Sequence, residues 1–280
     1  MPALNTLQPH ETPARNPASQ AAMPVLFVGH GSPMNAIEEN RFSLGWRSVA
    51  QALPKPEAIL CISAHWETRG TQVTAMEKPR TIHDFGGFPP ELYAVEYPAP
   101  GSPRLAQQVI AALKPANTAP DQHWGLDHGC WSVLRQMYPA ADIPVVQLSL
   151  DYTLEPQQHY TLAKRLLPLR QQGVLLLGSG NIVHNLRLVQ LQGSDFNAPF
   201  GLKWALEASS LIKKLIDSGD HHSLANYSAL GRSVALAIPT PEHYLPLLYI
   251  LALQQAGETV TYFNDQAVAG SLTMTSLVIH

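Results

Sequence analysis

Residues 25–32 read Val-Leu-Phe-Val-Gly-His-Gly-Ser, a short apolar run that ends in a glycine-flanked histidine. Residues 58–62 form a second apolar run that leads into Ser-Ala-His-Trp, and residues 174–177 form a third that leads to His184. Residues 144–148 form a fourth run, without a histidine. None of these runs alternates with polar residues, which is typical of strands that are buried on both faces of a sheet.

Longer amphipathic segments separate these runs and predict helices over residues 102–113, 155–170 and 202–215. Two further apolar segments, 259–263 and 272–279, are expected to be additional strands, with an antiparallel arrangement as one option. Strands that alternate with helices indicate an α/β protein with helices on both faces of a parallel or mixed sheet. We therefore expect a three-layer α/β/α fold with a central mixed sheet.

The composition of the chain and the absence of an internal linker indicate one domain. It has 280 residues, of which 45% are hydrophobic and 14% are charged. That is enough apolar material for a substantial core. Residues 1–22 contain four prolines and little apolar periodicity, so we expect a flexible N-terminal extension there. With no linker beyond it, residues 23–280 are expected to form a single catalytic domain.

Composition also argues against several classes of protein. A net charge of −3 opposes electrostatically driven nucleic-acid binding, which needs a basic surface. No apolar run approaches the roughly 20 residues of a membrane helix, and no secretory signal is evident. The two cysteines do not make a disulfide scaffold. These observations favour a cytoplasmic protein without nucleic-acid or membrane partners. A monomer and a small homo-oligomer are both compatible with them.

The placement of the histidines points to a site. In open α/β sheets, ligands bind beyond the carboxyl ends of the strands, which is where His30, His65 and His184 are expected to meet. His243 opens a later helical stretch, and His128 lies in an Asp-His-Gly sequence. Taken alone, each of them is better explained as a structural histidine of the core or of a loop. Three at successive strand ends favour a metal or catalytic site, because imidazole is the commonest protein metal ligand.

The remaining histidines lack this context, apart from His83 in a loop. We expect six of them to be surface residues: His10, His123, His159, His221, His222 and His280. The sequence also lacks the His-Glu-x-x-His, Cys-x-x-Cys, Gly-x-Gly-x-x-Gly and Gly-x-Ser-x-Gly patterns. Helical zinc proteases, thiolate zinc sites, dinucleotide sites and α/β hydrolases are therefore not indicated.

Five motifs together resemble the 4,5-DOPA extradiol dioxygenase family, a branch of the class III, LigB-type ring-cleaving dioxygenases. In chain order they are Gly-His-Gly-Ser-Pro-Met at 29–34, Ser-Ala-His-Trp at 63–66, Thr-Ile-His-Asp-Phe-Gly-Gly-Phe-Pro at 81–89, Gly-Leu-Asp-His-Gly at 125–129 and Pro-Thr-Pro-Glu-His-Tyr-Leu-Pro at 239–246. The resemblance covers the chain from about residue 23 to its end. It implies a LigB-like fold and the cleavage of a catechol beside its two hydroxyls.

The resemblance also implies roles for individual residues. His30, His65 and His243 match ligands of a non-haem Fe(II), with Zn(II) as another ion that purified protein can hold. His184 matches the active-site base, which can become a fourth ligand when zinc is bound. His128 matches a histidine that faces the substrate. Glu242 precedes His243, and adjacent side chains diverge, so we expect that carboxylate to orient an imidazole and not to bind the metal.

The residues themselves suggest further substrate contacts. The aromatic, glycine-containing loop 81–89, which includes His83, is suited to a wall or lid over a planar ring, although an ordinary connection explains it equally well. Trp66 is a candidate for stacking on the substrate, and Arg187 for binding a carboxylate, such as the one that DOPA carries. The expected partners are a small-molecule catechol and O2.

Three alternative functions remain open at this point. Metal chelatases also begin with a strand that runs into a His-Gly-Ser turn and use histidines in an α/β fold. A zinc-dependent hydrolase can likewise be built from three histidines and a water. A non-enzymatic relative that keeps the fold is the third alternative.

Overall fold

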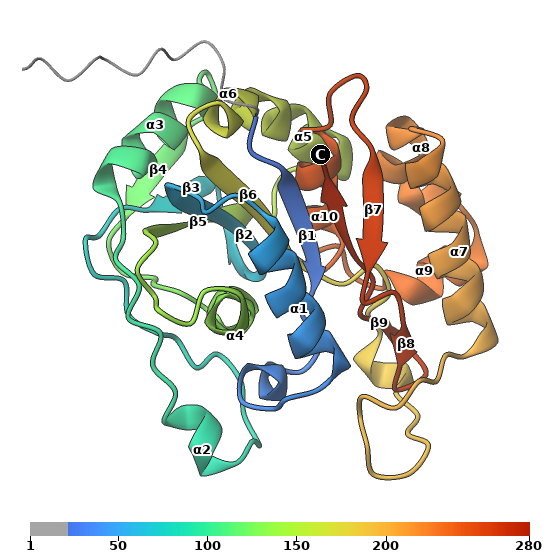
Figure 1. Cartoon of the computed structure of the whole chain (residues 1–280). Helices are drawn as coiled ribbons and strands as arrows, with labels where there is room; N and C mark the ends of the chain where they lie inside the picture. The colour runs from blue at the N-terminus through green and yellow to red at the C-terminus, as the bar shows by residue number, and fades with distance from the viewer. Residues whose placement is uncertain (1–21) are drawn as a thin grey trace, which may run out of the picture.

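The computed structural model describes residues 22–280, so the predicted N-terminal extension lies outside the described residues except for Ala22. Ten strands are found in this part of the chain: β1 (Val25–Gly29), β2 (Ala58–Thr68), β3 (Thr71–Thr74), β4 (Thr118–Asp121), β5 (Val145–Asp151), β6 (Val174–Gly180), β7 (Val260–Phe263), β8 (Ala267–Val268), β9 (Leu272–Thr273) and β10 (Ser276–Ile279). Eight of them form one sheet in the order β4-β3-β5-β2-β6-β1-β10-β7 (Figure 1), and β8 pairs with β9 separately.

The sheet is mixed, as the sequence predicts. Its centre is parallel, because β2 pairs in parallel with β5 and β6, and β6 pairs in parallel with β1. The C-terminal strand β10 is antiparallel to both β1 and β7. The expected antiparallel arrangement of the last strands is therefore confirmed, although the predicted strand 272–279 is divided into β9 and β10.

Successive side chains of each central strand enter two different cores. In β1, Val25 and Phe27 belong to one hydrophobic cluster, and Leu26 and Val28 belong to the other. All four are fully buried, and burying a side chain of this size stabilises the fold by about 1.5–3 kcal/mol. This double burial explains why the strand sequences are continuously apolar.

Helices cover both faces of the sheet and complete the three predicted layers. One core is packed by α3 (Pro103–Leu113), α5 (Pro156–Ala163), α6 (Leu167–Arg170), α7 (Lys203–Asp217), α8 (His221–Ala225), α9 (Arg232–Ala237) and α10 (Leu245–Leu251). The other is packed by α1 (Arg41–Ala52), α2 (Pro90–Tyr93) and α4 (His128–Met137). Short 3-10 segments lie at Pro33–Ala36, Lys164–Leu166, Leu186–Leu188 and Tyr227–Ala229.

The predicted helix 155–170 is the clearest departure from the sequence expectation, because it is broken into α5, a 3-10 turn and α6. Pro168 lacks the amide hydrogen that a continuous helix would donate to the carbonyl of Lys164, so the regular pattern is interrupted there. Within residues 22–280, no helix combines the length and the apolarity that crossing a membrane requires.

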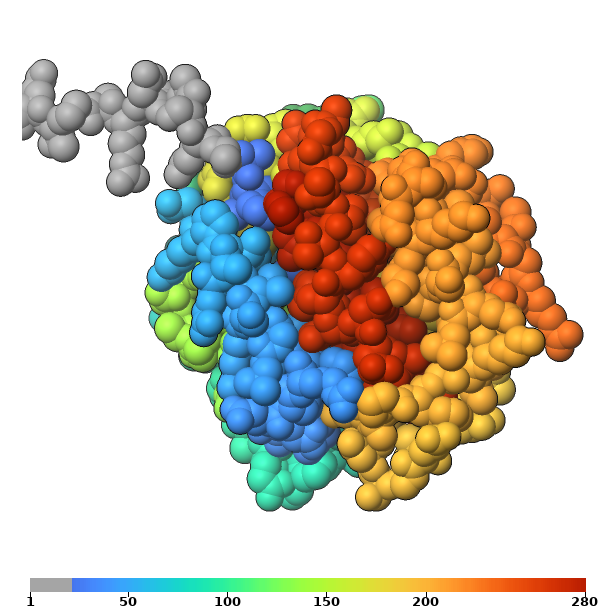
Figure 2. Space-filling model, turned by 45° about the vertical axis from the view of Figure 1, so that its right-hand side comes forward, coloured from blue at the N-terminus to red at the C-terminus, as the bar shows by residue number. Residues whose placement is uncertain are grey.

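The C-terminal strands lie between α1 and the helices α7 to α9. Figure 2 shows this segment, in red, at the surface between the blue α1 region and the orange α7 to α9 region. Asn264 donates a hydrogen bond to the carbonyl of Phe42 in α1 over 2.9 Å, and Lys213 of α7 forms an ion pair with Asp265 over 2.5 Å. The buried Arg170 also bonds to the carbonyls of Met23 and Leu253, both over 2.7 Å.

Candidate metal and active site

The carboxyl ends of β1, β2 and β6 bring three histidines to one edge of the sheet. His30 directly follows β1, His65 lies in the last part of β2, and His184 lies four residues beyond β6. His243 reaches the same place because its carbonyl accepts a hydrogen bond from the Asn181 amide, just past β6, over 2.9 Å. The topology therefore assembles residues that are up to 213 positions apart in the sequence.

His30, His65 and His243 form a compact group. Each offers one ring nitrogen, and these three nitrogens all lie within 4.8 Å of one another. The Nε2 atoms of His30 and His65 are 3.1 Å apart. Ring nitrogens that converge in this way suit one metal ion, and imidazole donors suit Fe, Zn, Cu or Ni. The donor set therefore fits the predicted iron and does not distinguish it from zinc.

Burial keeps these imidazoles neutral. It is the largest cause that lowers the pKa of His30 and of His243 well below the ordinary value, and the neighbouring histidines lower both further. Burial likewise lowers the pKa of His65 to about 3. A neutral imidazole has a free lone pair, which is the form that binds a metal. The site is thus preorganised as a ligand set at neutral pH.

His184 and His128 flank this group. The His184 ring stacks on His243, with ring centroids 3.5 Å apart and planes only 6° from parallel. Burial lowers the pKa of His184 to about 4, against the opposing effect of the Glu242 carboxylate. The His128 ring lies 3.9 Å from the ring of His65. The two residues predicted to be catalytic therefore contact the predicted ligands from different directions.

Two carboxylates, those of Asp84 and Glu242, contact the histidines on sides that do not line the pocket. Asp84 Oδ1 accepts the backbone N–H of His128 over 2.9 Å, and its Oδ2 lies 3.0 Å from His128 Nδ1 and 3.7 Å from His65 Nδ1. Burial alone would raise the pKa of Asp84, but the hydrogen bonds from His128 outweigh it and lower that pKa. Glu242 Oε1 lies 3.4 Å from His243 Nδ1, which is compatible with the orienting role expected for this residue.

The start of α4 places His128. Asp127 is the N-cap of this helix and accepts a hydrogen bond from the Cys130 amide over 3.1 Å. Gly129 then lets the helix approach β2 closely, because a Cβ at this position would lie 2.5 Å from Ser63 Oγ and 2.8 Å from His65 Cδ2. The close packing of α4 against His65 therefore requires glycine at position 129.

The five histidines lie in the wall of a pocket of about 450 Å³. Ser32 lines it as well, and the largest apolar side chains in its lining are Met34, Phe85, Phe88, Leu186, Phe196 and Leu272. A flat aromatic molecule would thus meet imidazoles on one side and apolar groups on the other. This combination of an apolar wall and a few convergent polar groups is typical of small-molecule sites.

The structure places the three predicted substrate contacts outside this lining. His83 is hydrogen-bonded through Nε2 to the carbonyl of Val95 over 3.0 Å. Trp66 is buried and stacks on Trp124, with ring centroids 5.6 Å apart. Arg187 is exposed on the surface. The loop 81–89 does reach the pocket, but through Phe85 and Phe88.

Sequence reasoning left several site residues unassigned. Asp84 stands in the 81–89 motif directly after His83, and Ser179 is the second-last residue of β6. The Ser179 hydroxyl lies 3.0 Å from His30 Nδ1. Leu186 and Phe196 carry no recognisable signal in the sequence, because an apolar residue in a loop is not by itself informative.

One histidine expected at the surface is instead in the core. His159 is fully buried, and its Nδ1 lies 3.0 Å from the hydroxyl of Tyr249 in α10. The expectation was wrong because the flanking residues of α5 are polar, whereas the face of this helix that carries His159 packs on α10. His123 and His222 are exposed, as predicted.

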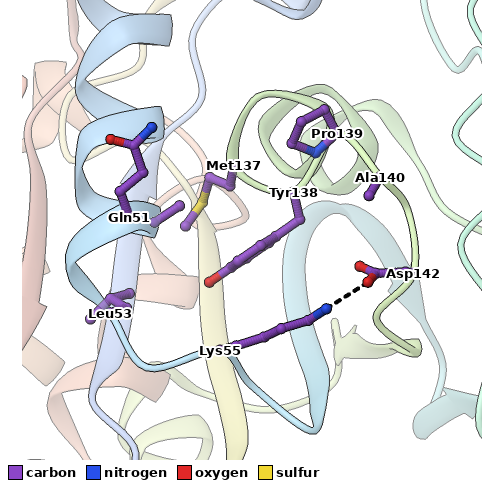
Figure 3. A pocket seen from close by; sticks show the side chains of 9 residues that line it. Gln51, Leu53, Lys55, Met137, Tyr138, Pro139, Ala140 and Asp142 are labelled. Carbon is purple, nitrogen blue, oxygen red and sulfur yellow. Dashed lines mark hydrogen bonds and ion pairs between the residues drawn. The ribbon is translucent and has the colours of Figure 1, made fainter.

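A second cavity, of about 400 Å³, lies beside the amino-terminal ends of β2 and β5 (Figure 3). It is bounded by the ends of α1 and α4, with the Tyr138 ring across it and an ion pair of 2.5 Å between Lys55 and Asp142. Its lining contains no histidine or cysteine. The histidines able to bind a metal line the other pocket, at the opposite ends of the strands.

Comparison with known proteins finds relatives that match over most of the chain. Residues 24–260 match the family described as the catalytic LigB subunit of aromatic ring-opening dioxygenase. A protein of Escherichia coli K12 named 4,5-DOPA dioxygenase extradiol is 47% identical over 265 residues, which cover 93% of this chain and 96% of that protein. A protein of the same name from Beta vulgaris is 41% identical and covers 83% of this chain, with 86% of its own length covered.

A solved structure shows the same fold. It is a crystal structure of a protein from Escherichia coli K12 that is described as uncharacterized, and it has 42% sequence identity and a TM-score of 0.79. The match covers 92% of this chain and all of the other.

Proposed function

The chain belongs to the LigB family of aromatic ring-opening dioxygenases, and we propose that it opens catechols such as DOPA by extradiol (4,5) cleavage at an Fe(II) held by His30, His65 and His243. Family membership favours this function over the chelatase, the hydrolase and the non-enzymatic relative. The observation that carries the proposal is the group of three buried imidazoles, with ring nitrogens within 4.8 Å, in the wall of an apolar pocket.

The donor set of His30, His65 and His243 fits an Fe(II) ion, which would supply positive charge that acidifies a catechol hydroxyl and a redox centre through which electrons of the substrate reach O2. The side chains of the protein would carry out all other steps. Phe85 and Phe88 would pack against the ring of the substrate, and the apolar lining would exclude water from it. Both atoms of O2 enter the product, a muconic semialdehyde, so that no external reductant is required.

His184 would act as the base. Its imidazole is neutral at pH 7, because burial lowers its pKa to about 4, and its lone pair is free to take the proton of a catechol hydroxyl. Stacking on His243 holds the ring beside a metal ligand and therefore beside a substrate bound there. A hydroxyl whose own acidity is increased by a bound cation needs only such a weak base.

His128 would return a proton to the substrate later in the reaction, after its Nε2 has taken one up from the substrate or from water. Its Nδ1 is engaged by Asp84 at 3.0 Å, which leaves Nε2 as the nitrogen that is available to a substrate. His128 also lines the pocket. His184 and His128 are thus positioned by different neighbours, so that one can accept the proton removed from the substrate and the other can supply the proton returned to it.

The test is anaerobic loading with Fe(II), followed by a panel of catechols that includes DOPA, with oxygen uptake and yellow semialdehyde absorbance recorded together. We expect both signals with the iron-loaded protein and neither with the metal-free protein. A parallel sample loaded with Zn(II) separates metal occupancy from activity. The absence of oxygen uptake with every catechol would contradict the proposal.

A further inference from the structure

The wall of the histidine pocket lacks a partner for a charged substituent. Among the described residues, no lysine, arginine, aspartate or glutamate lines it. Beyond the histidines, the polar side chain of the lining is the uncharged hydroxyl of Ser32. Arg187 follows the lining residue Leu186 directly, but it is exposed and lies outside the lining.

Two negative charges lie close to the pocket. Asp84 and Glu242 lie behind the imidazoles, 3.0 Å and 3.4 Å from ring nitrogens of His128 and His243. Both are committed to those contacts, so neither is free to pair with an ammonium group of a substrate. A carboxylate packed against the apolar wall would lose water without gaining a lysine or arginine as a partner, and these two groups would repel it.

An apolar substituent would have partners on several sides. Phe85, Phe88 and Phe196 line the pocket together with Leu186 and Leu272. Phe85 and Phe88 pack edge to face with ring centroids 5.2 Å apart, which gives this wall a fixed shape. Each methylene buried against such a wall strengthens binding by about 0.8 kcal/mol, or roughly fourfold.

From this lining we infer that the pocket selects catechols with an uncharged, apolar ring substituent over catechols that carry a carboxylate or an amino-acid group, DOPA among them. The inference rests on the proposed ring cleavage and specifies its substrate class. The selecting surface is the apolar wall of Phe85, Phe88, Leu186, Phe196 and Leu272. DOPA would be turned over, but as a poor substrate.

A matched pair of substrates tests this selection: 3-(3,4-dihydroxyphenyl)propanoate and its methyl ester, which differ in charge and little in shape. We expect kcat/KM of the iron-loaded protein to be at least tenfold higher for the ester, mainly through KM. Calorimetric binding of both compounds to the zinc-loaded protein should show the same order without turnover. If kcat/KM for the acid equals or exceeds that for the ester, the inference on selectivity is wrong, but the proposed ring cleavage stands. If neither compound nor 4-methylcatechol is turned over, both the inference and the proposed ring cleavage are wrong.

A charge introduced into the wall provides the second test. Leu186 is 61% exposed, so the Leu186→Arg variant should fold while placing a cation in the lining. We expect it to shift the ester-to-acid ratio at least threefold toward the acid. Leu188→Arg is the matched control, because Leu188 belongs to the same short turn but not to the pocket lining. An unchanged ratio in the first variant, or an equal shift in the control, would contradict the role of this wall.

Discussion

The hydroxyl of Ser179 holds the His30 ring in one tautomer. Its Oγ donates its only hydrogen to the carbonyl of Gly129 over 2.6 Å, so it must accept a hydrogen bond from His30 Nδ1, which lies 3.0 Å away. The proton of His30 is therefore on Nδ1, and the lone pair is on Nε2, the atom that faces His65. A serine at the end of β6 thus prepares a histidine at the end of β1 for metal binding.

Replacing this serine should weaken metal binding. In Ser179→Ala, His30 loses the acceptor that orients it, and we expect metal affinity to fall by about 10- to 100-fold, the usual effect of removing such a partner. The measurement is competition with a chelator. Ser276→Ala is the control, since Ser276 in β10 is equally buried but accepts a hydrogen bond from the Gly29 amide and makes none with an imidazole. Equal metal affinities of the two variants would show that Ser179 has no special role.

Asp84 should affect turnover more than metal content. The Asp84→Asn change keeps the shape of the side chain but removes the charge that faces His128 Nδ1 at 3.0 Å. We expect kcat to fall by about 10- to 100-fold, with at most a small change in KM and with metal stoichiometry retained. Steady-state kinetics and metal analysis of the same sample check this. Loss of metal together with activity would mean that Asp84 acts through His65, which is 3.7 Å away.

Substitutions should likewise distinguish the role of His184 as a base from the role of the metal ligands. His184→Ala should retain the metal and lose ring opening, because the three predicted ligands remain while the base is absent. His243→Ala should lose most of the metal, since two imidazoles hold an ion weakly. Metal stoichiometry after dialysis distinguishes these outcomes. Normal turnover by His184→Ala would exclude it as the base, and loss of its metal would identify His184 as a ligand.

Local sequence was sufficient for the main features of the fold and for two of the three proposed metal ligands, His30 and His65. The strands β1, β2 and β6 are recognisable because both faces are buried, which makes each of them a continuous apolar run. His30 and His65 could be located because they stand at or near the ends of such runs. His243 depended on the resemblance to a known family, since nothing in its own segment shows that it packs beside β6.

The hydrogen bonds that orient the site histidines could not be predicted from local sequence. The hydrogen bond from His30 to Ser179 spans 149 positions, and the contact of His128 with Asp84 spans 44. Such pairs are set by strand order and not by spacing in the chain. The expected role of Arg187 shows the converse, because the arginine lies near His184 in sequence and yet outside the pocket lining.

His159 should make stability sensitive to acid. Burial is the largest cause that lowers its pKa to about 4, whereas in the unfolded chain its pKa is about 6.5. Between these values the unfolded chain binds a proton that the folded chain does not, so the free energy of unfolding falls as the pH drops through this range. From pH 7.5 to pH 5, the contribution of this histidine is about 2 kcal/mol.

The comparison that isolates this effect uses metal-free protein and urea unfolding at both pH values. His159→Gln is less stable than the parent at pH 7.5, because the contact with Tyr249 at 3.0 Å is altered, but its further loss on acidification should be smaller by about 2 kcal/mol. The active-site histidines titrate in both proteins and cancel in the difference. His123→Gln, at an exposed position, should keep the full pH dependence of the parent. A pH dependence of His159→Gln equal to that of the parent would show that the buried imidazole is not the group that acid must charge.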